Sequence, residues 1–184
     1  MSEEYKKIIL IAVIALAVGA VVFFVTRSFY GPGGDKDAFR IAPPPQSAVE
    51  PASKERLLQQ AVAEDPDNPE KRALLGDYYF EITLYDKAIE EYRRVLELAP
   101  GDVDTYNDLG LALYYTRQGD AALETLRKGA EIAPTYQRIW LSLGFVLWQS
   151  GRGDEAREAL TRARDLGPET EMGKEAEAFL KRMG

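Results

Sequence analysis

The sequence of 184 residues contains neither cysteine nor histidine. Without cysteine the chain forms no disulfide, holds no thiolate-bound metal, and offers no cysteine nucleophile or lipid-modified cysteine anchor. Without histidine it lacks the side chain that most often binds transition metals and acts as a general base near neutral pH. Serine–histidine and cysteine–histidine catalytic groups are therefore excluded. We predict that the protein is not an enzyme and has no catalytic residue, no cofactor and no metal site.

Basic residues are also scarce relative to acidic ones. The chain has 23 Lys and Arg against 30 Asp and Glu, a formal net charge of −7. Nucleic-acid binding needs clustered basic side chains that neutralise phosphates, so no nucleic-acid partner is expected. Hydrophobic residues make up 46% and charged residues 29% of the chain. This balance is typical of a globular domain rather than a disordered chain.

The N-terminal part holds a long hydrophobic run. Residues 8–25 read IILIAVIALAVGAVVFFV, 18 residues without a polar side chain. At a rise of about 1.5 Å per residue they span about 27 Å, close to the thickness of a bilayer core. A cleaved signal peptide is the alternative, but the run continues well past Ala15-Leu16-Ala17, its candidate cleavage site. We predict a short tail at residues 1–7 and a transmembrane anchor at residues 8–26.

The flanking charges favour one orientation of this anchor. Lys6 and Lys7 precede it and three basic residues follow it by position 40, so the count is nearly balanced. A charged tail resists translocation, whereas a large C-terminal domain crosses largely regardless of charge. The expected location is the bacterial inner membrane, with the domain on the periplasmic side. Ala15 and Gly19 would let two anchors pack closely, which leaves a homo-oligomer open.

Residues 27–52 are expected to form a linker. Within 31–52 there are five prolines and three glycines, a composition that favours extended, solvated chain. The run Pro43-Pro44-Pro45 should form stiff polyproline II structure. We interpret this segment as a tether between membrane and domain. A proline-rich ligand for another protein is the alternative.

Three glycines recur at an interval of 34 residues: Gly76, Gly110 and Gly144. A leucine precedes each glycine, an alanine follows it twelve residues later, and a proline follows it twenty-four residues later. Glycine inside a helix costs about 0.5–1 kcal/mol relative to alanine. Its recurrence therefore indicates a place where two helices press together, with the alanine opposite. A 34-residue period with Leu-Gly, a later Ala and a closing Pro is the signature of the tetratricopeptide repeat.

On these residues the chain resembles the tetratricopeptide repeat (TPR) family. The resemblance implies an all-α fold, a short TPR solenoid of three helix-turn-helix repeats behind the transmembrane helix, with repeats at residues 69–102, 103–136 and 137–170. Each repeat would consist of helices A and B joined by a tight turn, with helix B capped by Asp86, Asp120 or Asp154. One departure is Gly129, which stands where the family usually has alanine.

Capping helices are expected at residues 53–65 and 171–184, because a terminal repeat would otherwise expose an apolar face. Ser53 is the predicted N-cap of the first. Its predicted buried stripe is Leu57, Leu58, Ala61 and Val62, and that of the second is Met172, Ala176, Phe179, Leu180 and Met183.

In this family the A helices line a concave surface, so A-helix residues outside the packing stripe are predicted to form a partner-binding groove. They are Glu70, Asp77, Phe80, Asn107, Leu111, Tyr114, Tyr115, Arg138, Leu141, Phe145 and Trp148. Phe145 and Trp148 suggest a binding surface because they are large and apolar. Packing against the C-terminal capping helix or the linker is the alternative. Asn107 would bond a peptide backbone as donor and acceptor, with a solvated helix residue as the alternative. Acidic residues in repeat 1 and aromatic ones in repeat 3 predict a ligand that is basic at one end and apolar at the other.

The stretch LLQQAVAEDPDNPEKRALLGDYYF is similar to the opening of the TPR factors of bacterial cytochrome c maturation. Those factors are membrane-tethered and hold apocytochrome segments on the periplasmic side. The resemblance implies a membrane-anchored scaffold or assembly factor that binds a partner protein segment, in the biogenesis of cytochrome c or another envelope complex. The alternative is a cytoplasm-facing structural adaptor that recruits soluble proteins to a membrane complex.

Overall fold

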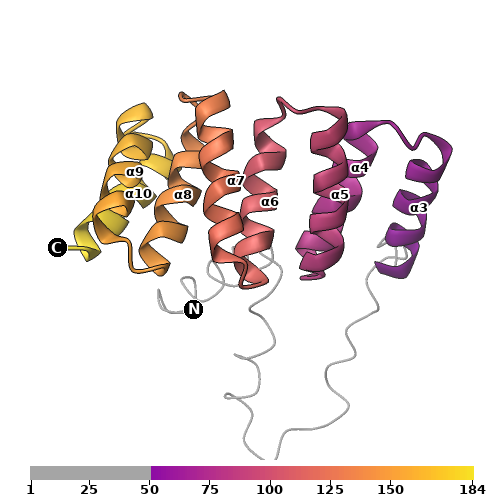
Figure 1. The fold of residues 1–184 in the computed structure, drawn as a ribbon, viewed down its shortest axis with the longest axis horizontal. Coiled ribbons are helices and arrows are strands. Elements are labelled where there is room, and N and C mark those ends of the chain that lie inside the picture. Colours follow the sequence, from indigo (N-terminus) through magenta and orange to yellow (C-terminus); the bar gives the residue numbers. More distant parts are fainter. Residues whose placement is uncertain (1–50) are drawn as a thin grey trace, which may run out of the picture. The chain divides into compact units, whose positions relative to one another are not determined.

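The computed structural model describes residues 51–184, which form eight helices and no strand (Figure 1). The helices are α3 (Pro51–Glu64), α4 (Pro69–Glu81), α5 (Tyr85–Leu98), α6 (Val103–Tyr115), α7 (Gly119–Ile132), α8 (Gln137–Gln149), α9 (Gly153–Leu166) and α10 (Glu171–Arg182). Three antiparallel pairs make the repeats: α4 with α5, α6 with α7 and α8 with α9. We call the first helix of each pair A and the second B. Helices α3 and α10 flank them, so the predicted all-α solenoid with capping helices is confirmed.

The predicted tail and anchor lie outside the described residues, as does the linker up to residue 50. Within residues 51–184, no helix combines the length and the hydropathy that crossing a membrane requires. Helix α3 begins at Pro51, the first-turn position that proline favours. Ser53 is therefore inside the helix, and its predicted role as N-cap is wrong.

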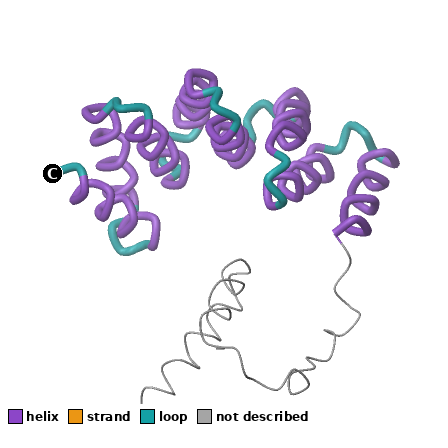
Figure 2. The backbone as a smooth tube through the Cα atoms, turned by 90° about the horizontal axis from the view of Figure 1, so that it is seen from below, coloured by secondary structure: helices purple, strands orange, loops and turns teal. Residues whose placement is uncertain are grey.

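The stack bends toward its A helices. Helix α6 contacts α4 on one side and α8 on the other, in addition to its own B helix. Each of α5 and α7 contacts the A helix of the next repeat. The A helices therefore lie on the inner side of the arc that the helices describe in Figure 2. This is the side on which the groove is predicted.

The repeating glycines set the distance between the A and B helices. A Cβ on Gly110 would lie 2.5 Å from Cγ and 2.7 Å from Cδ2 of Leu126, which is fully buried in α7. The same relation holds between Gly144 and Leu160 and between Gly76 and Tyr92. The predicted close approach is thus present. The side chain against each glycine is the one sixteen positions later, however, rather than the alanine twelve positions later.

The starts of the B helices differ from the prediction. Asp86, Asp120 and Asp154 are the second residues of their helices, where a carboxylate still interacts favourably with the helix dipole. The N-cap positions are occupied by Leu84, Gln118 and Arg152, none of which caps with its side chain. Side-chain caps occur instead at α4, α6 and α10, from Asn68, Asp102 and Thr170.

Both flanking helices cover the ends of the array, with less of each predicted stripe than expected. In α3, Leu58 and Val62 pack against the core, whereas Leu57 is 60% exposed. In α10, Ala176 is fully buried, whereas Met172 is 36% exposed. Each capping helix contacts the end repeat with only one narrow face. Leu57 and Met172 lie at the edges of the predicted stripes and therefore remain exposed to solvent.

Candidate functional site: a groove along the A helices

Seven aromatic side chains form a continuous row across the A helices. In order of contact they are Phe80, Tyr85, Tyr115, Tyr114, Phe145, Phe179 and Trp148, and we call them the aromatic row. The rings of Tyr85 and Tyr115 are stacked at 4.9 Å between centroids, and those of Tyr114 and Phe145 meet edge to face at 5.4 Å. Such pairs stabilise one another beyond simple burial. The row is therefore a preformed apolar strip that crosses all three repeats.

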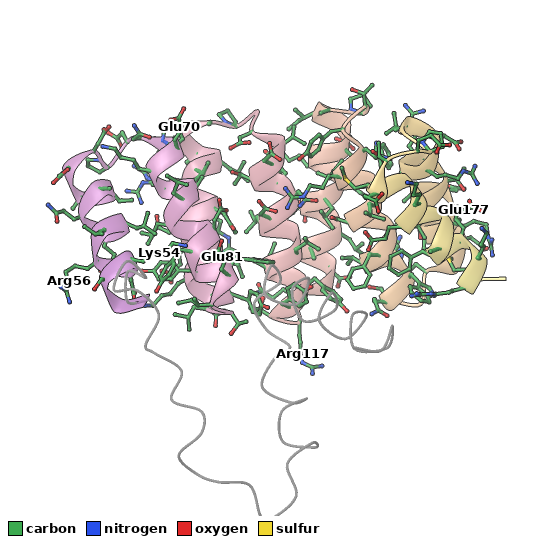
Figure 3. All side chains as sticks on the ribbon, turned by 180° about the vertical axis from the view of Figure 1, so that it is seen from behind. Lys54, Arg56, Glu70, Glu81, Arg117 and Glu177 are labelled. Carbon is green, nitrogen blue, oxygen red and sulfur yellow. The ribbon has the colours of Figure 1, made fainter. Side chains whose placement is uncertain are left out.

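The row lies at one edge of the domain because its residues come from the ends of the A helices, the start of α5 and the last part of α10. Figure 3 shows this edge by three labelled neighbours: Glu81, which follows Phe80; Arg117, which closely follows Tyr115; and Lys54 of α3. Lys54 Nζ lies 3.0 Å from Glu81 Oε2. Glu70, a predicted groove residue, lies at the opposite edge (Figure 3).

The row remains open to solvent. Tyr115 is 47% exposed, and the other six side chains are half-buried against the core. Aromatic side chains that stay accessible on one side mark an interaction surface more often than a solvated face. The row therefore packs against the hydrophobic core on one side and is accessible to solvent on the other.

Closer to the starts of the A helices than the row lie four charged residues: Asp77, Asp104, Asp108 and Arg138. We call them the charged cluster. Arg138 Nη2 lies 3.3 Å from Asp108 Oδ1, and Arg138 Nη1 lies 3.7 Å from Asp104 Oδ1. The Tyr92 hydroxyl donates a hydrogen bond to Asp77 at 2.8 Å, and the Tyr136 hydroxyl donates one to Asp104. The cluster holds three carboxylates and one guanidinium, which faces Asp104 and Asp108, so two negative charges are uncompensated within it.

Partial removal from water makes this excess costly for two of the carboxylates, Asp77 and Asp108. Desolvation raises the pKa of Asp77 above its ordinary value, although the hydrogen bond from Tyr92 opposes the shift. Desolvation likewise raises the pKa of Asp108, against the hydrogen bond from Asn107 and the charge of Arg138. Both carboxylates are thus less well stabilised in their ionised form than they would be in water.

Asn107 is fully buried, so the alternative of a solvated helix residue is wrong, whereas the contact with a peptide backbone stays a prediction. Its amide nitrogen donates to Asp108 Oδ1 at 2.9 Å, and its Oδ1 accepts no hydrogen bond from the described residues. The cause is the central place of α6, which has an A helix on either side. The matching positions in the outer repeats, Ala73 and Leu141, are only half-buried.

The remaining predicted groove residues divide between the row, the cluster and the core. Leu111 packs against the core, and Leu141 packs against the buried contact between α9 and α10. The rings of Phe145 and Trp148 lie 6.0 Å and 5.2 Å from that of Phe179. Phe145 and Trp148 therefore do pack against the C-terminal capping helix, which was the alternative for them. Because Phe179 of that helix is itself part of the row, this packing belongs to the row.

Two members of the row were not predicted from sequence. The sequence places Phe179 only in the predicted stripe of the C-terminal capping helix. Tyr85 begins α5, at the position where the next two repeats have Gly119 and Gly153. An aromatic residue kept in one repeat, where the others have glycine, is the signal that could have identified it.

The described residues contain no group of three or more acidic side chains arranged to hold a metal ion. The groove offers apolar rings, carboxylates and one guanidinium, which are groups suited to binding a polypeptide.

Comparison with known proteins identifies the repeat. Two family models match in adjoining segments: a TPR repeat model over residues 76–116 and a tetratricopeptide repeat model over residues 113–178. A curated relative, formate-dependent nitrite reductase complex subunit NrfG of Escherichia coli O157:H7, is 33% identical over 69 residues. The match covers 38% of this chain and 35% of that relative, about a third of its length.

Solved structures of MamA share the fold. The crystal structure of MamA superposes with a TM-score of 0.62 at 23% identity, over 72% of this chain and 86% of that one. The MamA RS-1 ArsTM double mutant superposes with a TM-score of 0.64 at 24% identity, over 72% of this chain and 73% of that one.

Proposed function

Because the chain carries tetratricopeptide repeats, and is thereby a scaffold for protein–protein interaction, we propose that it is a membrane-anchored assembly factor whose groove holds a segment of a partner protein. The observation that carries this proposal is the aromatic row. It presents rings from all three repeats, and its most exposed residue, Tyr115, is 47% exposed. Buried aromatic anchors dominate the energy of protein interfaces. Binding, rather than catalysis, is the role that this surface supports.

The partner we propose is a subunit of an envelope redox complex, with a c-type cytochrome as the first candidate. Two observations support this choice. The chain is similar to NrfG, whose name places it in a nitrite reductase complex. The stretch from Leu57 to Phe80 is similar to the opening of cytochrome c maturation factors. The hydrophobic run at residues 8–25 supports the anchor, and the charged tail before it supports a periplasmic domain.

A cytoplasm-facing adaptor is the second candidate, favoured by the basic residues that follow the hydrophobic run. The two candidates place the domain on opposite sides of the membrane. A protease added to intact spheroplasts reaches a periplasmic domain and spares a cytoplasmic one.

Affinity capture of the full-length tagged chain from detergent-solubilised membranes tests the function itself. The expected results are extraction only with detergent, digestion of the domain in spheroplasts, and capture of one envelope enzyme subunit identified by mass spectrometry. Release of the chain by carbonate alone would contradict the anchor. A protected domain that captures only soluble cytoplasmic proteins would favour the adaptor instead.

A further inference from the structure

The charged cluster and the aromatic row lie on the same A helices, and on each helix the cluster residues come before the row residues in the sequence. Asp77 precedes Phe80 on α4, and Asp108 precedes Tyr115 on α6 by seven residues. At about 1.5 Å per residue, the latter pair is separated by about 10 Å along the helix axis. The charged and apolar parts of the groove are therefore separated along the A helices. The sequence had suggested a separation from repeat 1 to repeat 3, but the row crosses all three repeats.

The cluster is deficient in positive charge and in hydrogen-bond donors. Arg138 faces two carboxylates, Asp104 and Asp108, and Asp77 accepts a hydrogen bond from the neutral Tyr92 hydroxyl. A second observation beside Asp108 also shows a missing hydrogen-bond donor. The fully buried Asn107, whose amide nitrogen is bonded to Asp108, leaves its Oδ1 without a donor among the described residues. A buried acceptor without a partner is rare in folded proteins and costs free energy.

From this juxtaposition we infer that the groove is specific for an extended segment with a basic side chain, arginine above all, about three residues from an aromatic or apolar residue. The basic side chain lies against Asp77, Asp104 and Asp108, while the apolar residue lies on the aromatic row beside Tyr115. Three residues of extended chain span about 10 Å, the separation found on α6. A guanidinium supplies both the charge and the several N–H donors that the cluster lacks.

The charges around the cluster support this choice of ligand. Asp102 and Glu81 also bear electrostatically on Asp77, which adds to the negative field. Lys54 is engaged with Glu81 at the edge of the domain. An acidic segment would be repelled here, because like charges placed together across an interface are strongly unfavourable. The inference rests on the proposed function, since it names the chemistry of the segment that the same groove binds.

The test is calorimetric titration of the full-length chain in detergent with three synthetic peptides, GRAPFAYG, GAAPFAYG and GEAPFAYG. The Arg peptide should bind at least about tenfold more tightly than the Glu peptide at low ionic strength, and the ratio should shrink at high ionic strength. Asp108→Asn should weaken the Arg peptide and leave the Ala peptide unchanged. It removes the charge while keeping an acceptor for the Asn107 amide.

Glu124→Gln is the matched control, because Glu124 is an exposed carboxylate on α7, outside the groove. It should leave all three affinities unchanged. Equal binding of the Arg and Glu peptides, with loss of both in Tyr115→Ala, would overturn the charge preference and leave the proposed groove intact. An equal effect of Glu124→Gln and Asp108→Asn would also overturn it. Failure of all three peptides to bind would count against both the inference and the proposed function.

Discussion

Ile139 of α8 occupies the space that a side chain on Gly129 of α7 would need. A Cβ on Gly129 would also lie 2.8 Å from Cβ of Tyr106 in α6. Ile139 is fully buried. The contact joins the second repeat to the third, and the stability of a repeat array depends on such interfaces between neighbours. Gly129, which departs from the family pattern, thus leaves space that the Ile139 side chain of the next A helix fills.

This contact predicts coupling between the two positions. Gly129→Ala should lower the free energy of unfolding by about 1–3 kcal/mol through overpacking, and Ile139→Val by about 0.5–1.5 kcal/mol through a lost methyl group. Together they should cost less than the sum, because valine lacks the Cδ1 atom nearest to Gly129. This double-mutant cycle is measured by urea unfolding of the compact unit Val49–Gly184, followed by circular dichroism. Strict additivity would contradict the contact.

Gly110 offers a second test of close packing. Gly110→Leu should be severely destabilising. Gly110→Ala should also cost about 1–3 kcal/mol, because its Cβ would lie 2.5 Å from the branched Cγ of the buried Leu126. The sequence alone suggested that alanine would be much less harmful. Gly119→Ala is the control: no atom lies within 4 Å of the added Cβ, so this change should be neutral or slightly stabilising. Similar losses at Gly110 and Gly119 would argue against the contact.

The turn between helices A and B carries backbone strain at a repeating position. Thr83, Arg117 and Gly151 have φ angles of 62°, 64° and 74° in successive repeats. This left-handed region is unfavourable for a β-branched residue. Thr83→Gly should therefore stabilise the domain by about 1 kcal/mol, and Gly151→Thr should destabilise it by a similar or larger amount. Thermal unfolding of the two variants checks the opposite signs; a loss of stability in Thr83→Gly would contradict the argument.

The half-buried carboxylate of Asp108 should make the stability of the domain depend on pH. Burial raises its pKa in the folded state above the ordinary value of 3.8, so the folded state binds more protons than the unfolded state across that window. Its contribution to stability therefore falls as pH rises from about 4 through the folded-state pKa, and is constant above it. The difference in unfolding free energy, Asp108→Asn minus wild type, should increase over this window. A difference that falls or stays flat would contradict the assigned burial effect.

The periodic features of the fold could be predicted from the sequence, because a 34-residue repetition of Gly, Ala and Pro records the same packing three times. Features specific to one repeat could not. The sequence predicts Asn107 to lie in the groove because its position in the repeat matches those of Ala73 and Leu141. It is buried because α6 alone has A helices on both sides. Phe179 joins the aromatic row only through the docking of α10, which no repeat pattern encodes.

The most direct test of the proposed groove is quantitative capture of the partner by Tyr115→Ala and by Ile132→Ala. The two residues are similarly exposed, at 47% and 43%, but Ile132 lies at the end of B helix α7, outside the aromatic row. Loss of an aromatic anchor typically costs 2 kcal/mol or more, about a thirtyfold loss of affinity. Such a loss is expected for Tyr115→Ala, with a wild-type helical circular dichroism spectrum and cooperative thermal unfolding as the control for folding, and wild-type capture is expected for Ile132→Ala. Wild-type capture by a folded Tyr115→Ala variant, with loss in Ile132→Ala, would place the binding surface on the other side of the array.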